Sequence, residues 1–114
     1  MPNDPVFDRV REFCLSLPRA AEKLSHGTPC FLIEKGRHFA SYLENHHGDG
    51  RIALWLAAPQ GVQEMLIEED SDIYFRPPYV GPSGWIGVRL DRGLDWETVE
   101  AMIVEAHGMM ARKK

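Results

Sequence analysis

Residues 23–56 follow a period of two, the period at which side chains alternate between the two faces of a β-strand. The alternation is clearest in residues 30–43 and 51–56. Two polar, glycine-bearing stretches interrupt it, EKGRH (residues 34–38) and ENHHGDGR (residues 44–51), and hairpin turns are expected there. Because short turns of this kind join antiparallel neighbours, the segment predicts a meander of three or four antiparallel strands.

Apolar residues at helical spacing flank this meander on both sides. A first helix is predicted over residues 5–17, because Pro18 cannot continue it. A long last helix follows Asp95, which suits the N-cap position. Residues 58–70 predict a short helix and residues 84–91 a further strand. The predicted fold class is therefore α+β, an antiparallel β-sheet with N- and C-terminal helices packed on one face.

The length of 114 residues suits a single domain, residues 1–114, with one hydrophobic core. No apolar run approaches the roughly 18 residues that a membrane-spanning helix needs. The N-terminal residues MPNDPVFDRV do not resemble a signal peptide, so a cytoplasmic location is expected. Cys14 and Cys30 both lie in apolar segments, which predicts buried thiols and no disulfide in a reducing compartment.

The formal net charge of −4 does not favour simple nucleic-acid binding, but the charge is unevenly distributed. Residues 19–51 carry five Lys or Arg against four Asp or Glu, whereas residues 52–114 carry six against ten. Four of the five histidines also fall within residues 19–51. Any contact with a polyanion is therefore expected in the middle of the chain, strengthened when histidines are protonated below about pH 6.5.

Strand parity predicts which side chains a sheet covered by helices on one face would leave on the other. If Leu54 and Val88 face the helices, their sequence neighbours face the opposite way. The residues expected on that second face are Arg51, Ala53, Trp55, Trp85, Gly87 and Arg89. Indole rings beside guanidinium groups can stack on bases or clamp an anionic ligand. The alternative is that a loop or a second subunit covers these tryptophans, whose role is then packing.

The stretch FRPPYVGPSGWIGVRLD, residues 75–91, combines three prolines with three glycines. The prolines restrict the backbone and the glycines permit tight turns, so a stiff turn is expected. Such a turn would deliver Trp85 and Arg89 in a fixed position, with Arg76 and Tyr79 at its edge. The alternative is a rigid connection between two strands.

Metal binding and catalysis have little support in the sequence. His46 and His47 are adjacent and chelate poorly if extended, and no Cys, His or Asp pair has zinc-like spacing. His26 and His38 stand at either end of the first hairpin, where they would contact phosphate or solvent. No nucleophile with a base and an orienting group is recognisable, and phosphate-binding glycine motifs are absent. No metal, cofactor or catalytic residue is therefore assigned.

Three blocks together resemble the MmcQ/YjbR-like family of small bacterial proteins: HGTPCFLIEKGRHFASYL, RIALWL and FRPPYVGPSGWIGVRLD. The most specific part is residues 77–91. Where family members often have GKxFA, this chain has GRHFA, so a basic residue is kept but the lysine is displaced. The resemblance implies an α+β fold of the CyaY-like type and a proposed role in DNA binding through a double wing of β-hairpins. The wings would be the hairpin around Lys35, Arg37 and His38 and residues 76–83.

Two functional hypotheses follow. In the first, the protein binds DNA through basic and aromatic wings, with Trp55 and Trp85 stacking or wedging. The residues expected to contact the nucleic acid are Lys35, Arg37, His38, Arg51, Arg76, Tyr79 and Arg89. In the second, the same aromatic–arginine face binds a small anionic ligand or a protein partner without catalysis. A closed pocket around Trp55, Trp85 and Arg89 would favour a small molecule, and a flat exposed face would favour a partner.

Overall fold

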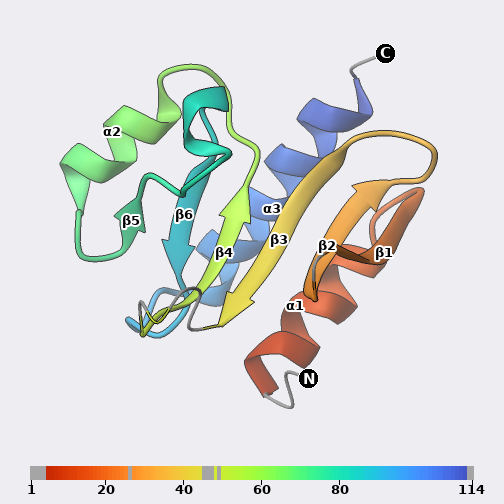
Figure 1. Ribbon diagram of the computed structural model, residues 1–114, viewed down its shortest axis with the longest axis horizontal. Helices are drawn as coiled ribbons and strands as arrows, with labels where there is room; N and C mark the ends of the chain where they lie inside the picture. Colours follow the sequence, from red (N-terminus) through yellow and green to blue (C-terminus); the bar gives the residue numbers. More distant parts are fainter. Residues whose placement is uncertain (1–4, 26, 45–47, 49, 113–114) are drawn as a thin grey trace.

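The structure is a computed structural model that describes residues 5–25, 27–44, 48 and 50–112. These residues form three α-helices and one six-stranded antiparallel sheet (Figure 1). The helices are α1 (Pro5–Leu15), α2 (Val62–Glu69) and α3 (Trp96–Ala111). The strands are β1 (Ala20–Ser25), β2 (Thr28–Ile33), β3 (His38–Glu44), β4 (Ile52–Leu56), β5 (Tyr74–Phe75) and β6 (Ile86–Arg89), and the 3-10 turn η2 spans Gly81–Ser83. The predicted α+β class is confirmed.

The first four strands pair with their neighbours along the chain, which confirms the predicted meander. The sheet order is β1-β2-β3-β4-β6-β5, so the chain leaves the sheet after β4, forms α2, and returns at the far edge. The expected strand over residues 84–91 is shorter in the structure, Ile86–Arg89. The preceding extended segment pairs only at Tyr74 and Phe75, because Pro77 and Pro78 supply no N–H to a strand ladder.

Helices α1 and α3 cover one face of the sheet, as Figure 1 shows with both behind the strands. Ring contacts connect the two layers: Phe7 of α1 lies 4.9 Å from Tyr42 of β3, and His107 of α3 lies 5.3 Å from Phe39. The Nε2 atom of His107 also lies 2.7 Å from the carbonyl oxygen of Pro18, which ties α3 to the turn after α1. Much of the core therefore lies between the helices and the sheet.

A β-bulge at Phe39 changes the alternation that the sequence suggests. Leu32 pairs with His38 and Phe31 with Ala40, so Phe39 is an extra residue in β3. Simple alternation would place Phe39 and Tyr42 on opposite faces, yet both rings contact helices. The bulge lets one strand supply two large rings to the same core.

The remaining expectations for the helices hold with small differences. Helix α2 begins only at Val62, because Gly61 before it adopts a left-handed φ of 88°. Asp95 does occupy the N-cap position of α3, but its backbone carbonyl, not its side chain, accepts the first helical hydrogen bonds. No helix within the described residues combines the length and the hydropathy needed to cross a membrane.

Candidate nucleic-acid interface

The face of the sheet opposite the helices is defined by one row of residues that crosses all six strands. The register pairs each member of the row with the next across neighbouring strands. The row is Lys23, Cys30, Ser41, Trp55, Gly87 and Phe75. The predicted parity of β4 and β6 is therefore confirmed, since Trp55 and Gly87 share this face while Leu54 and Val88 pair on the other.

Gly87 leaves a gap in this row, and the ring of Phe75 fills it. A Cβ atom at residue 87 would collide with the Cζ and Cε atoms of that ring. The guanidinium of Arg51 lies over the same ring, with its Cζ atom 4.2 Å from the ring centroid. Phe75 was not identified from the sequence, although an interior glycine in a strand signals a close approach of this kind.

The two tryptophans do not form an open stacking surface, which corrects the sequence-based interpretation. Trp55 is 7% exposed and Trp85 is 8% exposed, and both belong to the main hydrophobic cluster. Trp55 pairs with Ser41 and Gly87 on the predicted face of the sheet, but neither indole is open to solvent. Parity determines the direction of a side chain, whereas its exposure depends on the size of its neighbours.

Arg89 is engaged by a carboxylate from its own chain. Its Nε and Nη2 atoms donate to the two carboxylate oxygens of Asp91, each at 3.1 Å. This hydrogen bonding from Arg89 lowers the pKa of Asp91 below its ordinary value. The charge of Arg89 is thus largely compensated, and the guanidinium is held near the sheet.

Residues 76–84 form the predicted stiff turn, and it presents an aromatic ring. Tyr79 has a positive φ of 65° and is 75% exposed. The N–H of Val80 donates to the carbonyl of Pro78 at 2.6 Å, which closes a tight turn around Tyr79. Arg76 lies over Gly81, where a Cβ atom would come 2.7 Å from its Cγ. A strained backbone that exposes a large ring is typical of a functional site.

The side chain of Gln63 anchors the turn formed by residues 76–84 to helix α2. Gln63 is buried in α2, and its Nε2 atom donates to the carbonyl oxygens of Gly81 at 2.9 Å and Trp85 at 2.6 Å. Gly81 is the first residue of η2, and Trp85 follows the end of η2 at Ser83. One side-chain amide therefore binds the backbone at both places. The role of Gln63 could not be predicted from the sequence, because a single glutamine in a short amphipathic helix does not indicate which groups it will bind.

The turn between β2 and β3 presents the second group of predicted residues. Lys35 and Arg37 are both exposed, and Lys35 rather than Gly36 carries the positive φ, at 60°. His38 opens β3 and is half-buried. Burial, followed by the charge of Lys23, lowers the pKa of His38, so protonating it requires more acidic conditions than for a free histidine. The fixed positive charge of this turn is therefore that of its lysine and arginine.

Both turns lie at the same end of the sheet. Ala40, Leu56 and Ile86 stand side by side in the register, so the start of β3, the end of β4 and the start of β6 coincide. Figure 1 shows the β2–β3 turn and η2 at the top of the sheet. Three strand spacings separate the centres of the two turns, which corresponds to about 14 Å. Arg51 and Arg89 lie toward the opposite end and are not brought together with Lys35 and Arg37.

Charge differs between the two sides of the sheet. Helices α2 and α3 together carry six glutamates and no lysine or arginine. The side without helices and its turns carry a basic set: Lys23, Lys35, Arg37, Arg51, Arg76 and Arg89. Glutamates therefore gather on α2 and α3, whereas these basic side chains belong to the other face and its turns, where Glu34 also lies and Asp91 pairs with Arg89.

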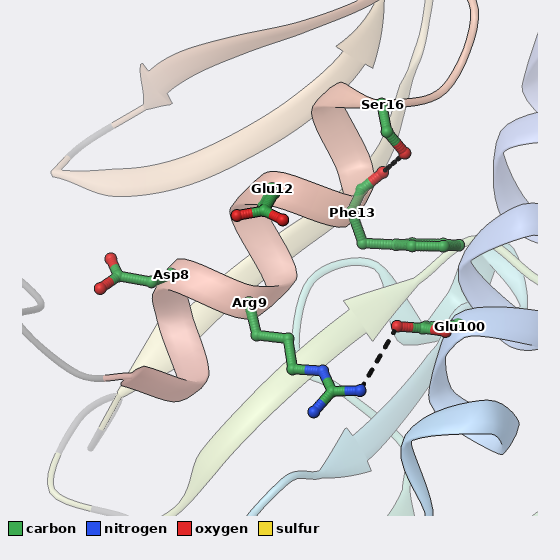
Figure 2. A pocket seen from close by; sticks show the side chains of 6 residues that line it. All are labelled: Asp8, Arg9, Glu12, Phe13, Ser16 and Glu100. Atoms are coloured by element: carbon green, nitrogen blue, oxygen red, sulfur yellow. Dashed lines mark hydrogen bonds and ion pairs between the residues drawn. The ribbon is translucent and has the colours of Figure 1, made fainter.

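A surface hollow of about 540 Å³ separates α1 from α3 and contains none of the predicted site residues (Figure 2). Arg9 bridges it toward Glu100 at 3.9 Å and stacks on Trp96 at 4.5 Å. Elsewhere in the described part of the chain no three His, Cys, Asp or Glu side chains gather in a way that could hold a metal ion. His26, His46 and His47 lie outside the described residues.

These features define a small α+β protein with two projecting turns at one end of an antiparallel sheet. The chain belongs to the YjbR family, whose sequence model matches residues 15–109. Among solved structures, the chain is similar to the Deinococcus radiodurans protein DR2400, described as having the domain DUF419. The TM-score is 0.78 at 20% identity, over 94% of this chain and 79% of the other. No curated protein sequence matches significantly.

Proposed function

We propose that this YjbR-family protein binds DNA through the two turns at one end of its sheet, residues 34–38 and 76–83. The observation that carries the proposal is the juxtaposition of these turns: one presents Lys35 and Arg37, and the other presents Arg76 and Tyr79. Their separation of about 14 Å is comparable to the width of a DNA groove, about 12 Å for the major groove.

In this arrangement the roles of the predicted residues divide. Lys35 and Arg37 contact phosphates, since both are exposed on a turn that is fixed at both ends by strands. Tyr79 contacts a base or sugar, because its strained backbone holds the ring in solvent. Trp55 and Trp85 make no contact with the nucleic acid and instead support the sheet beneath the turns.

The second hypothesis, a small anionic ligand on an open aromatic–arginine face, has less support from the geometry. It requires accessible indole rings, and Trp55 and Trp85 are buried. It also requires an available guanidinium at Arg89, which donates two hydrogen bonds to Asp91. DNA binding needs neither, because its contacts come from the two turns.

A fluorescence anisotropy titration with a short labelled duplex, repeated at several salt concentrations, tests the proposal. We expect micromolar or tighter binding at low salt that weakens as salt rises. Reversing both charges, Lys35→Glu with Arg37→Glu, should lower affinity at least tenfold and reduce the salt slope by roughly 2, about 0.9 for each phosphate that is no longer neutralised. Absence of salt-dependent binding by the unmodified protein at micromolar concentration would contradict the proposal.

A matched control variant distinguishes the effect of charge in the turns on DNA affinity from the effect of the protein's overall charge. Arg92 is exposed just after β6, whose last residue Arg89 lies toward the end of the sheet opposite the two turns, so Arg92→Glu changes the net charge without touching either turn. We expect its effect on affinity to be less than about twofold per charge. An equal loss from Arg92→Glu and from Arg37→Glu would show that only the overall charge matters.

A further inference from the structure

A groove of about 420 Å³ runs between α2 and α3 on the helix side of the sheet. Its floor is apolar, built from Leu56, Tyr74 and Ile86 of the sheet, and its walls come from the two helices. Met65 of α2 lines the groove and is 56% exposed, so its thioether side chain is accessible from solvent. The groove opens on the helix face of the sheet, whereas Trp55 and Gly87 lie on the other face; its floor residues Leu56 and Ile86 are at the same end of the sheet as the two turns.

The rim of this groove is acidic. Glu69 and Glu105 line it, one from each helix. An adjoining hollow of about 460 Å³ shares Thr98, Met102 and Glu105 with the groove and adds the carboxylates of Asp95 and Glu97. The residues lining these two hollows include four carboxylates and no lysine, arginine or histidine. The surface therefore has an apolar floor and an acidic rim, with no basic side chain among the residues that line it.

We propose that the α2–α3 groove is a docking site for a basic amphipathic segment of a partner protein. Apolar side chains of that segment enter between Met65 and Met102, and its lysines or arginines meet Glu69 and Glu105. Methionines line many grooves that accept helical segments, because the flexible thioether side chain adapts to different shapes. The charge of the rim selects a basic partner and repels a nucleic acid. The site thus goes beyond the proposed DNA binding and does not depend on it.

The probe for the test is a short fluorescein-labelled peptide of leucine and lysine, with the leucines at i, i+3, i+4 and i+7 so that one helical face is apolar. A peptide of the same composition in scrambled order is its reference. We expect the amphipathic peptide to bind about tenfold more tightly than the scrambled one. Equal affinity of the two peptides would overturn the proposal, since only general charge attraction would then remain.

Labelling the methionine methyl groups with ¹³C locates the bound peptide. The sequence has five methionines, of which Met65 and Met102 line the groove and Met110 is buried elsewhere on α3. We expect the peptide to shift the signals of Met65 and Met102 and to leave that of Met110 in place. Shifts confined to other signals would place the peptide elsewhere and overturn the proposal.

Two variants test the electrostatic and the apolar contributions to peptide binding separately. Glu69→Gln with Glu105→Gln should weaken peptide binding about fivefold, and Met65→Gln should do so to a similar degree. The control is Glu12→Gln with Glu44→Gln, which removes the same charge from exposed positions outside the groove and outside both turns, and should change affinity less than about twofold. An equal loss in the control would overturn the proposal.

The remaining outcomes separate this site from other possibilities. Sedimentation that shows a dimer dissociated by Met65→Gln would replace the partner with a second copy of the chain and overturn the proposal. DNA affinity should be unchanged in the Glu69→Gln, Glu105→Gln protein. If the unmodified protein binds the peptide but not DNA, only the proposed function is overturned. If it binds DNA but not the peptide, only the docking site is overturned.

Discussion

The ring of Phe75 occupies the space above Gly87, so that the side chain of β5 completes the surface of β6. The guanidinium of Arg51 lies over the same ring, 4.2 Å from its centroid. One glycine therefore determines the position of an aromatic ring and of a charged group. This relationship fixes the edge of the sheet at a strand that is only two residues long.

Replacing Gly87 with alanine should displace the Phe75 ring and destabilise the protein by about 1–3 kcal/mol, because a Cβ atom there overlaps the ring. Phe75→Leu alone should be milder, and the double substitution should be less destabilising than the sum of the two. Urea denaturation of the four proteins gives the coupling energy. Additive effects would mean that the two residues do not share this space.

Replacing Gln63 with leucine should cost about 1–3 kcal/mol, since the carbonyls of Gly81 and Trp85 then have no side-chain donor in a buried setting. Gln63→Glu should be worse at neutral pH, because a carboxylate cannot donate and carries a buried charge. Chemical denaturation at neutral and acidic pH compares the variants. We expect the glutamate variant to recover partly on acidification, and a pH-independent loss of stability would argue against the donor role.

Tyr79→Gly should raise the free energy of unfolding by about 1 kcal/mol, because glycine adopts a positive φ without strain. The same change should weaken the proposed DNA binding, since the exposed ring is removed. Tyr79→Asn is the matched control for the backbone, as asparagine tolerates this conformation better than tyrosine. If the glycine variant is less stable than the unmodified protein, the ring contributes packing that outweighs the strain.

Cys14 should make the protein less stable at alkaline pH. Burial, with a smaller contribution from Glu22, raises the pKa of this thiol from 9.0 to about 12 in the folded state. As pH rises, the thiol ionises first in the unfolded chain. The free energy of unfolding is therefore unaffected by this group below pH 9.0. Between pH 9.0 and about 12 it falls by about 1.4 kcal/mol per pH unit.

Denaturation of the unmodified protein and of Cys14→Ala across this range tests the prediction, because lysines and tyrosines titrate equally in both. The difference in stability between the two should shrink as pH rises above the ordinary thiol pKa. Thiol-reactive dye should also label Cys14 only after unfolding, as the side chain is fully buried. Parallel pH profiles for the two proteins would contradict the assigned pKa shift.

The sequence predicts most of the fold, because the periodicity of this chain is strong. The meander, the first and last helices and the shared face of Trp55 and Gly87 all follow from spacing. The bulge at Phe39 does not, since an extra residue in a strand depends on packing against α3. The position of β6 beside β4 also depends on the long return through α2 rather than on any local signal.

The candidate site is predicted less completely. Lys35, Arg37 and Tyr79 are exposed as a binding role requires, because turns between strands project into solvent. The burial of Trp85 and the pairing of Arg89 with Asp91 depend on which side chains are neighbours in space, which alternation alone does not specify. The interactions of residues 76–84 with Gln63 are likewise long-range.

The six glutamates of α2 and α3 are separated from Lys35 and Arg37 of the β2–β3 turn, an arrangement that the formal charge of −4 conceals. At physiological ionic strength a charge is screened beyond about 8 Å, so an approaching surface interacts with one side of the protein at a time. A negative surface is attracted locally to Lys35 and Arg37, and a positive surface to the glutamates of α2 and α3. Orientation, rather than net charge, then decides which surfaces meet.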